Sequence, residues 1–297
     1  MASLKSQRHH WWPEAVSQFW VSPEDGLTGW IRPNGSVKRL PPKNLGGITN
    51  GHAVKYSKDP NDSMGVDASF EGEFERADSA FPAVVRWLDS LEFQSLEPSQ
   101  GTGRFTPIDS NDAEVASLLE CMVSLVVRSP MTREACARLS EAWRGPLAAR
   151  ERNALISMNL WHLQRRFVDG LGVNGKFVVI FSPSREFIFG DGFFSNFQPA
   201  NLPELPKMLV PMTPRAAVLY VRPIRYGREP RISTLSVDAD DADALNLAVQ
   251  VYAKENIFFR QEQPSVSAYF AGSNHLTFSD SANPVDRLIG LIPGCSA

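Results

Sequence analysis

The sequence predicts an α+β fold, in which a helical region comes first and a mixed or antiparallel sheet with a late helix follows. Apolar residues recur at helical spacing between residues 70 and 168, whereas short apolar runs separated by turns dominate residues 176–237. Helices grouped ahead of strands favour α+β over an alternating α/β fold. A chain of this length can bury one large core. We therefore expect a single domain over 1–297, with an aromatic β-hairpin region (1–56), a helical region (70–170), a sheet region (175–260) and a C-terminal appendage (261–297).

The first region is predicted to form a β-hairpin among many aromatic residues. Leu27–Ile31 and Val37–Leu40 flank Asn34-Gly35, a pair that adopts the backbone of a tight turn at little cost. The polar stretch 57–67 is expected to be a loop. This region holds four of the seven tryptophans, namely Trp11, Trp12, Trp20 and Trp30.

Four helices are predicted in the middle of the chain, each with an apolar stripe of period 3.6. The first carries Pro82, where a bend is expected, and residues 92–110 after it are expected to be a loop. Ser110 or Asn111 caps the second helix and Thr132 caps the third. The expected helices are Phe70–Leu91, Asn111–Arg128, Thr132–Trp143 and Ala149–Val168.

The last third is predicted to be mostly strands. Lys176–Phe181 and Glu186–Phe189 are apolar runs separated by a turn, which indicates a buried hairpin. Three further strands are expected at Met208–Met212, Ala216–Val221 and Arg231–Val237, and Pro211 places the first of them at a sheet edge. A helix opened by Asp240 or Asp241 should run to Lys254.

Composition excludes several functional classes. The formal net charge is −3, so a nucleic-acid partner would not be bound through a strongly basic surface. No apolar run has the length of a membrane helix, and no membrane partner is expected. Three unpaired cysteines and a polar N-terminus favour a cytoplasmic location. Phosphate-binding loops, dinucleotide fingerprints and the common serine and zinc hydrolase motifs do not occur.

Short motifs in a shared order resemble a bacterial family catalogued as domain-of-unknown-function family 4238, over about Arg8 to Phe259. Trp11 stands where the family has tyrosine, and Gly-Phe replaces the family's Asn-Pro after Asp191. The resemblance implies an order of elements and a fold rather than a reaction. The matching segments are His9–Pro13 with Ser17–Trp20, Phe70–Val84, Arg128–Pro130, Phe189–Gly192 with Val210–Pro214, and Asn246.

Histidines and acids supply the candidate groups for proton transfer and metal binding. His9 or His10 could act as a general base or a ligand, because imidazole titrates near neutral pH; alternatively, hydrogen bonds merely pin the N-terminal segment. Glu71, Glu75 and Asp78 follow one helical face, where three carboxylates would attract a divalent cation. The alternative is an acidic first turn that complements the positive end of the helix, which explains Asp78 least well.

Two further candidates end predicted elements. Arg128, at the end of an apolar helix, could clamp a phosphate or a carboxylate; alternatively, it is a cation at the negative helix end that pairs with Asp78 or Glu71. Asp191 follows the most apolar strands and precedes Gly192, a position where sites are often built. The alternative for Asp191 is an ordinary Asp-Gly turn.

These candidates lead to two hypotheses about function. In the first, Glu71, Asp78 and Asp191 hold a divalent metal, Arg128 stabilises negative charge and His10 or His9 moves a proton, as in a metal-assisted, nuclease-like hydrolase of phosphodiesters. In the second, the chain is a non-enzymatic module for a protein partner, its polar residues are structural, and exposed Trp11, Trp20 or Trp30 marks the contact surface. The oligomeric state cannot be deduced from the sequence.

Overall fold

A computed structural model describes residues 8–49, 51–54, 68–91, 104–278 and 283–295. The fold is α+β, as the sequence predicts. The expected loop at 57–67 lies outside the described residues. The helices are α1 (Glu14–Ser17), α2 (Gly72–Ser90), α3 (Asp112–Arg128), α4 (Pro130–Arg144), α5 (Ala149–Leu171), α6 (Ala239–Tyr252), α7 (Ala268–Ala271) and α8 (Pro284–Ile289), with 3₁₀ turns at Gln18–Trp20 and Pro42–Asn44.

The largest sheet has five strands in the order β10-β11-β8-β12-β7. All neighbours are antiparallel except β8 and β12, which run parallel, so the sheet is mixed. The expected edge position of the strand that contains Pro211 is confirmed. The five strands are β7 (Phe105–Ile108), β8 (Lys176–Phe181), β10 (Lys207–Thr213), β11 (Ala216–Val221) and β12 (Ile232–Ser236).

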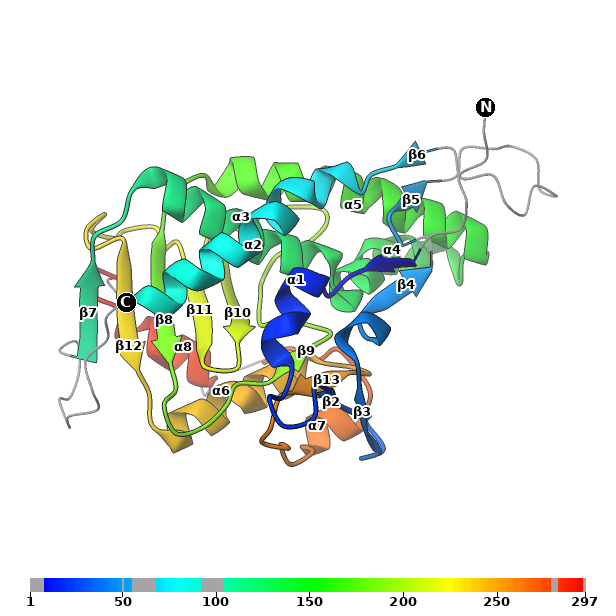
Figure 1. Ribbon diagram of the computed structural model, residues 1–297. Helices are drawn as coiled ribbons and strands as arrows, with labels where there is room; N and C mark the ends of the chain where they lie inside the picture. The colour runs from blue at the N-terminus through cyan, green and yellow to red at the C-terminus, as the bar shows by residue number, and fades with distance from the viewer. Residues whose placement is uncertain (1–7, 50, 55–67, 92–103, 279–282, 296–297) are drawn as a thin grey trace.

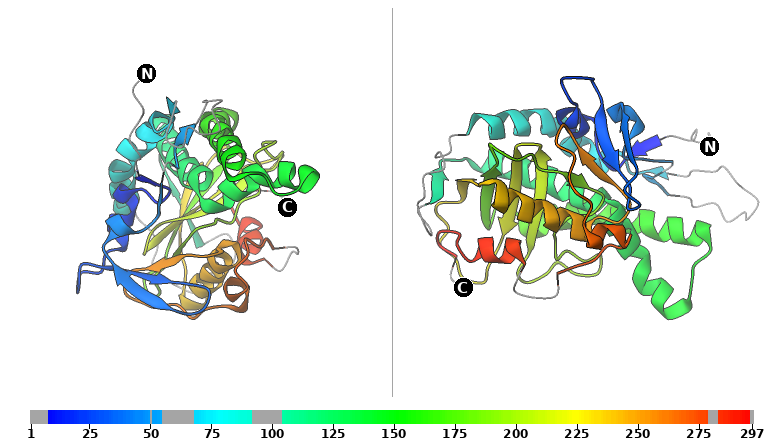
Figure 2. Two further views of the ribbon diagram at one scale, coloured as in Figure 1. Left: turned by 90° about the vertical axis from the view of Figure 1, so that its right-hand side faces the viewer. Right: turned by 90° about the horizontal axis from the view of Figure 1, so that it is seen from below.

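Helices cover both faces of this sheet. The side chains of β8 alternate between the two faces. Phe177 and Val179 pack into the core formed with α2, α3 and α5, whereas Val178 and Ile180 pack into the core formed with α6 and α8. Figure 1 shows the first group of helices above the sheet and the second group below it, and Figure 2 shows the same layers from two other sides. The C-terminal helix α8 is thus a part of the lower core.

A second sheet joins the N-terminal hairpin to the end of the chain. Its order is β3-β2-β13-β9, from β2 (Thr28–Ile31), β3 (Val37–Leu40), β9 (Phe189–Gly190) and β13 (Ile257–Phe259). The expected hairpin is confirmed, and Gly35 has the positive φ of 77° that its turn requires. The remaining strands form two small pairs, β1 (Arg8–His10) with β4 (Gly47–Thr49), and β5 (Ala53–Val54) with β6 (Ala68–Ser69).

The structure corrects three local predictions. β8 does not form a hairpin with the run at 186–189, because β11 and β12 occupy both of its edges; β9 pairs with β13 instead. Of the expected loop at 92–110, residues 92–103 lie outside the described residues, and Phe105–Ile108 form strand β7 instead of a loop. The caps of α4 and α6 are Ser129 and Asp238, which precede the residues expected from the sequence and accept a hydrogen bond from a backbone N–H of the first turn.

The first two long helices follow the sequence closely. Asn111 and Glu114 form a capping box at the start of α3, and α3 ends at Arg128 as expected. α2 continues through Pro82 to Ser90. α3 and α4 meet at Ser129 with an angle of 56° between them. Among the described residues no single helix is long and apolar enough to cross a membrane, and by length and composition alone only this bent pair qualifies.

Aromatic stacking fixes the N-terminal segment on the second sheet. The Trp12 ring is fully buried and stacks on Phe258 and Phe189, with ring centroids 4.3 and 4.8 Å away. Trp20 meets Trp12 edge to face at 5.8 Å. Because stacked aromatic pairs add to the energy of area burial, this cluster anchors the strand that carries His9 and His10.

We expect Trp12→Ala to lower the free energy of unfolding by about 3–5 kcal/mol, because it leaves a large cavity over the Phe189 and Phe258 rings. Urea denaturation followed by circular dichroism measures this change. The matched control is Trp143→Ala on α4, whose side chain is 84% exposed and should change stability by less than about 0.5 kcal/mol. Equal effects of the two substitutions would contradict the anchoring role of Trp12.

Candidate functional site

The Arg128 guanidinium is buried, with 1% of the side chain exposed, at the point where α3 ends. It donates five hydrogen bonds, as many as the group has N–H donors. Two reach the Asp78 carboxylate at 2.8 and 3.3 Å, two reach Ser124 Oγ, and one reaches the His10 carbonyl oxygen at 3.4 Å. The group also lies 4.4 Å from the centre of the Phe74 ring. We call this set of contacts the Arg128 network.

The local sequence explains these contacts. Phe74 and Asp78 are four residues apart on α2, so they share the face that packs against α3. Ser124 and Arg128 have the same spacing on α3. The predicted pairing of Arg128 with Asp78 is therefore present. Since all donors of Arg128 have partners within the chain, the guanidinium positions other residues and does not offer a free donor to a substrate.

A second group lies next to the Arg128 network and consists of two imidazoles on one carboxylate. His52 Nδ1 is 2.5 Å from Glu71 Oε2, and His9 Nε2 is 3.5 Å from the same oxygen. The two imidazole rings are 5.0 Å apart. We call His9, His52 and Glu71 the Glu71 triad.

Two short strand pairs bring the triad together. His9 lies in β1, which pairs with β4, and His52 follows β4 along the chain. His52 precedes β5 and Glu71 follows β6, and these strands are antiparallel with Ala53 opposite Ser69. In this register His52 lies opposite Phe70, whose backbone N–H donates to the His52 carbonyl oxygen at 3.0 Å. This places the His52 imidazole beside Glu71, the residue after Phe70.

Hydrogen bonds fix the tautomer of His9. The backbone N–H of His52 donates to His9 Nδ1 at 3.2 Å, so a neutral His9 carries its proton on Nε2. That nitrogen is buried and lies 3.5 Å from Glu71 Oε2, and it makes no hydrogen bond within the described residues. All described contacts of Glu71 with the imidazoles use Oε2, and the side chain is 48% exposed.

Burial and charge set the protonation of the triad. Burial lowers the pKa of His52 to about 4, in spite of the hydrogen bond to Glu71, and it also lowers the pKa of His9. Burial alone would raise the pKa of Glu71, but the hydrogen bond from His52 and the charges of His52, His9 and Arg128 together lower it. At neutral pH the triad therefore consists of two neutral imidazoles and one carboxylate.

Arg133 on α4 interacts with the segment that carries His52 and with His9 of the triad. Its Nη1 donates to the carbonyl oxygen of Gly51 at 2.9 Å, which holds the turn that carries His52. Burial lowers the pKa of Arg133 to about 10, and its charge acts on His9. His52 and Arg133 were not among the predicted site residues, because no spacing along the chain connects either residue with Glu71.

The structure corrects the predicted grouping of Asp191 with the other acids. The Asp191 carboxylate accepts backbone N–H groups from Lys254, Glu255 and Asn256 and the side-chain amide of Asn256. It thus ties the loop after α6 to β9. The predicted metal set of Glu71, Asp78 and Asp191 is therefore not assembled, and in the described part of the chain no group of three His, Cys, Asp or Glu side chains could hold a metal ion.

The other predicted residues lie in different places. His9 belongs to the triad, whereas the contribution of His10 to the Arg128 network is its backbone carbonyl. Glu75 is exposed on α2. Trp11 and Trp20 are buried, so they do not form the exposed partner surface that the second hypothesis expected.

Comparisons with protein-family models, curated proteins and solved structures found no match to this chain. The resemblance to domain-of-unknown-function family 4238 therefore stays a prediction.

We expect Arg128→Lys to lower the free energy of unfolding by about 3 kcal/mol or more, because it leaves part of a buried ion pair without its partners. Chemical denaturation measures this change. Arg86→Lys, on the exposed side of α2, is the control and should be close to neutral. If Arg128→Lys is as stable as the unmodified chain, the network is not a structural constraint.

We expect stability to fall as the pH is lowered from about 6.5 towards 4. An unfolded chain binds a proton at His52 near its ordinary pKa of 6.5, whereas the folded chain resists protonation until about pH 4. The stability contributed by neutral His52 is thus complete above pH 6.5 and is lost through this window.

Melting temperatures between pH 7.5 and 4.5 measure this effect. The loss should be smaller in His52→Gln, which cannot titrate, than in the unmodified chain. His162→Gln, at an exposed position on α5, should leave the pH dependence unchanged. Parallel pH profiles for His52→Gln and the unmodified chain would contradict the assigned burial of His52.

Proposed function

We propose that this chain is a hydrolase of phosphodiesters in which Glu71 is the group that moves a proton. The observation that carries the proposal is the convergence of two neutral imidazoles on Glu71 Oε2, while the carboxylate remains half exposed. Such an arrangement orients a carboxylate and leaves its second oxygen for a water molecule. His9 and His52 are positioning residues, because both are buried.

The proposed step is the attack of water on phosphorus. Glu71 Oε1 accepts a proton from the water molecule as its oxygen bonds to phosphorus, and the protonated Glu71 then returns this proton to the oxygen that leaves. The charge of Arg133 acts on His9, whereas that of Arg128 is paired with Asp78. A positive charge near the site favours an anionic substrate and an anionic transition state.

Arg128 and Asp78 have different parts in this proposal from those that the sequence suggested. Their charges are paired with each other, so Asp78 is not a free metal ligand and Arg128 is not a free clamp. The cleavage assay described below tests whether the proposed reaction needs a divalent metal ion. Among the described residues no group of three His, Cys, Asp or Glu side chains could hold such an ion, so the assay compares cleavage with and without added metal.

A second candidate function is a non-enzymatic module for a protein partner. It is favoured by the complete use of the Arg128 donors inside the chain and by an exposed apolar face on α4. Leu139 and Trp143 form that face, one helical turn apart, and are 64% and 84% exposed. In this case the Glu71 triad would only fasten β1 to α2.

We expect the purified chain to cleave labelled single-stranded RNA or DNA, and Glu71→Gln to reduce the rate at least a hundredfold, in line with the loss of a general base. The assay is run with magnesium, with manganese and with a chelator, so that any need for a metal is measured directly. Glu75→Gln is the matched control, because Glu75 is an exposed carboxylate on the first turns of the same helix.

The outcomes separate the two candidate functions. Loss of cleavage in Glu71→Gln, with cleavage retained in Glu75→Gln, supports the hydrolase. The absence of cleavage under all three conditions, or equal rates in the unmodified chain and Glu71→Gln, would reject it and favour the interaction module.

A further inference from the structure

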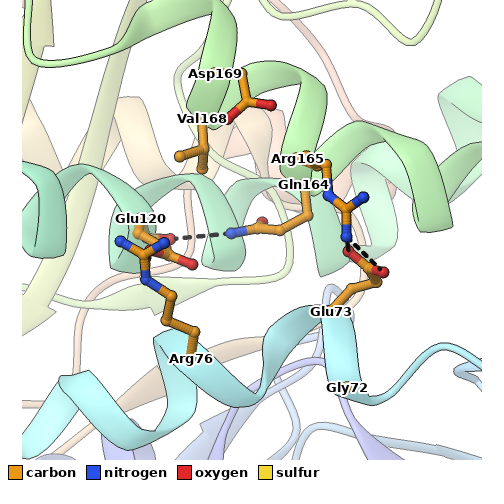
Figure 3. Close-up of a pocket in the computed structure, with 8 residues that line it drawn as sticks. All are labelled: Gly72, Glu73, Arg76, Glu120, Gln164, Arg165, Val168 and Asp169. Carbon is orange, nitrogen blue, oxygen red and sulfur yellow. Dashed lines mark hydrogen bonds and ion pairs between the residues drawn. The ribbon is translucent and has the colours of Figure 1, made fainter.

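A cavity of about 290 Å³ lies between α2, α3 and α5, and a different side of α2 from the Glu71 triad forms one of its walls. The polar and charged side chains that line it are Glu73 and Arg76 from α2, Glu120 from α3, and Gln164, Arg165 and Asp169 from α5 (Figure 3). The cavity is thus lined by three helices and by mostly charged groups.

Gln164 is the most deeply buried polar residue in the lining of this cavity. Only 2% of the residue is exposed, and its Nε2 donates to the backbone carbonyl oxygen of Glu120 at 3.4 Å. This bond fixes the orientation of the amide, because the reversed amide would place two oxygens against each other. The other end, Oε1, is buried and has no hydrogen-bond partner among the residues that the structure describes. An unpaired buried acceptor costs free energy, and a ligand with an N–H or O–H donor would remove that cost.

The charges around Gln164 are arranged for a cation. Glu120 is almost fully buried, its pKa is raised by burial, and Arg76 pairs with it at 2.7 Å from a side chain that is 74% exposed. Asp169 adds a second negative charge close enough to act on Glu120. Glu73 pairs with Arg165 at 3.3 Å and accepts from the Trp161 indole. Three carboxylates face two guanidinium groups, so the cavity has a surplus of one negative charge.

An anion would find no suitable place in the same cavity. Both guanidinium groups already contact carboxylates, as Figure 3 shows for Arg165 and Glu73. The unpaired atom is an acceptor, which repels an anionic oxygen. A cavity of about 290 Å³ is also much larger than a bare metal ion and approaches the size of small-molecule sites.

We propose that this cavity binds a small organic cation with several N–H donors, of the alkylguanidinium or alkylammonium class. One N–H of the ligand donates to Gln164 Oε1, and the positive charge lies beside the carboxylate of Asp169. Among the described residues Asp169 has no ion pair, whereas Glu120 and Glu73 are paired with Arg76 and Arg165. The alkyl part of the ligand packs against Val168, the apolar side chain of the lining. This proposal is independent of the proposed hydrolase activity.

The test is isothermal titration calorimetry of the full chain with agmatine, which carries an ammonium group, a guanidinium group and a four-carbon linker. We expect saturable binding of one agmatine per chain, weaker at high salt because the attraction is electrostatic. N-butylurea, a neutral analogue with N–H donors, should bind at least tenfold more weakly.

Variants of the lining locate the binding site. Asp169→Asn should weaken agmatine binding about fivefold and Gln164→Met about tenfold, because each removes one partner of the ligand. Asp240→Asn, an exposed substitution on α6, should leave the affinity unchanged. Asp169 is exposed, so its variant folds even where Gln164→Met proves unstable.

Three results would overturn the proposal: no saturable binding of agmatine, equal binding of N-butylurea, or unchanged affinity in Asp169→Asn. Agmatine binding to Glu71→Gln should equal that of the unmodified chain. A failure here is therefore distinguishable from a failure of the hydrolase, which is measured by cleavage.

Discussion

The burial of the Arg128 charge is the constraint on which the site depends. Removing a guanidinium from water costs several kcal/mol unless its donors find partners. Here the partners come from three segments: Asp78 on α2, Ser124 on α3 and the carbonyl of His10 on β1. The charge can be satisfied only when these segments are all in place, so the position of β1 relative to α2 is fixed by the same bonds that neutralise Arg128.

The burial of Arg128 also determines the geometry of the Glu71 triad. His9 is the neighbour of His10 in β1, and Glu71 precedes Asp78 by two helical turns on the same face of α2. Fixing His10 and Asp78 on Arg128 therefore sets the distance between the His9 imidazole and the Glu71 carboxylate. Of the two interpretations that the sequence left open for Arg128, the structure contains the pairing with Asp78. The guanidinium is a structural cation, and through its partners it positions the group to which we assign the proton transfer.

The sequence predicted what depends on local spacing. The period of Val115, Leu118 and Met122 located α3, and the helical repeat of Glu71 and Asp78 placed these acids on the face that meets Arg128. The prediction failed where the structure depends on the pairing of strands that are far apart in the sequence. The run before Asp191 looked like one half of a hairpin with β8, yet β12 takes the free edge of β8 from more than fifty residues away, which leaves β9 to pair with β13. Asp191 follows β9 into that second sheet and so leaves the expected site. His52 was missed for the same reason, since its approach to Glu71 depends on the two-residue strands β5 and β6, which have no detectable period.

The rotation of α2 about its axis connects the two sites of the molecule. Phe74, Ala77 and Phe81 are buried, and they fix which side of the helix faces the core. With this rotation set, Glu71 and Asp78 face β1 and α3, whereas Glu73 and Arg76 face α5 and the cavity. Glu71 and Glu73 both lie at the N-terminal end of α2, which is the positive end of the helix dipole. The acidic start of α2 therefore does more than complement the dipole, because the helix divides its charges between a carboxylate held by imidazoles and a cavity lined by ion pairs.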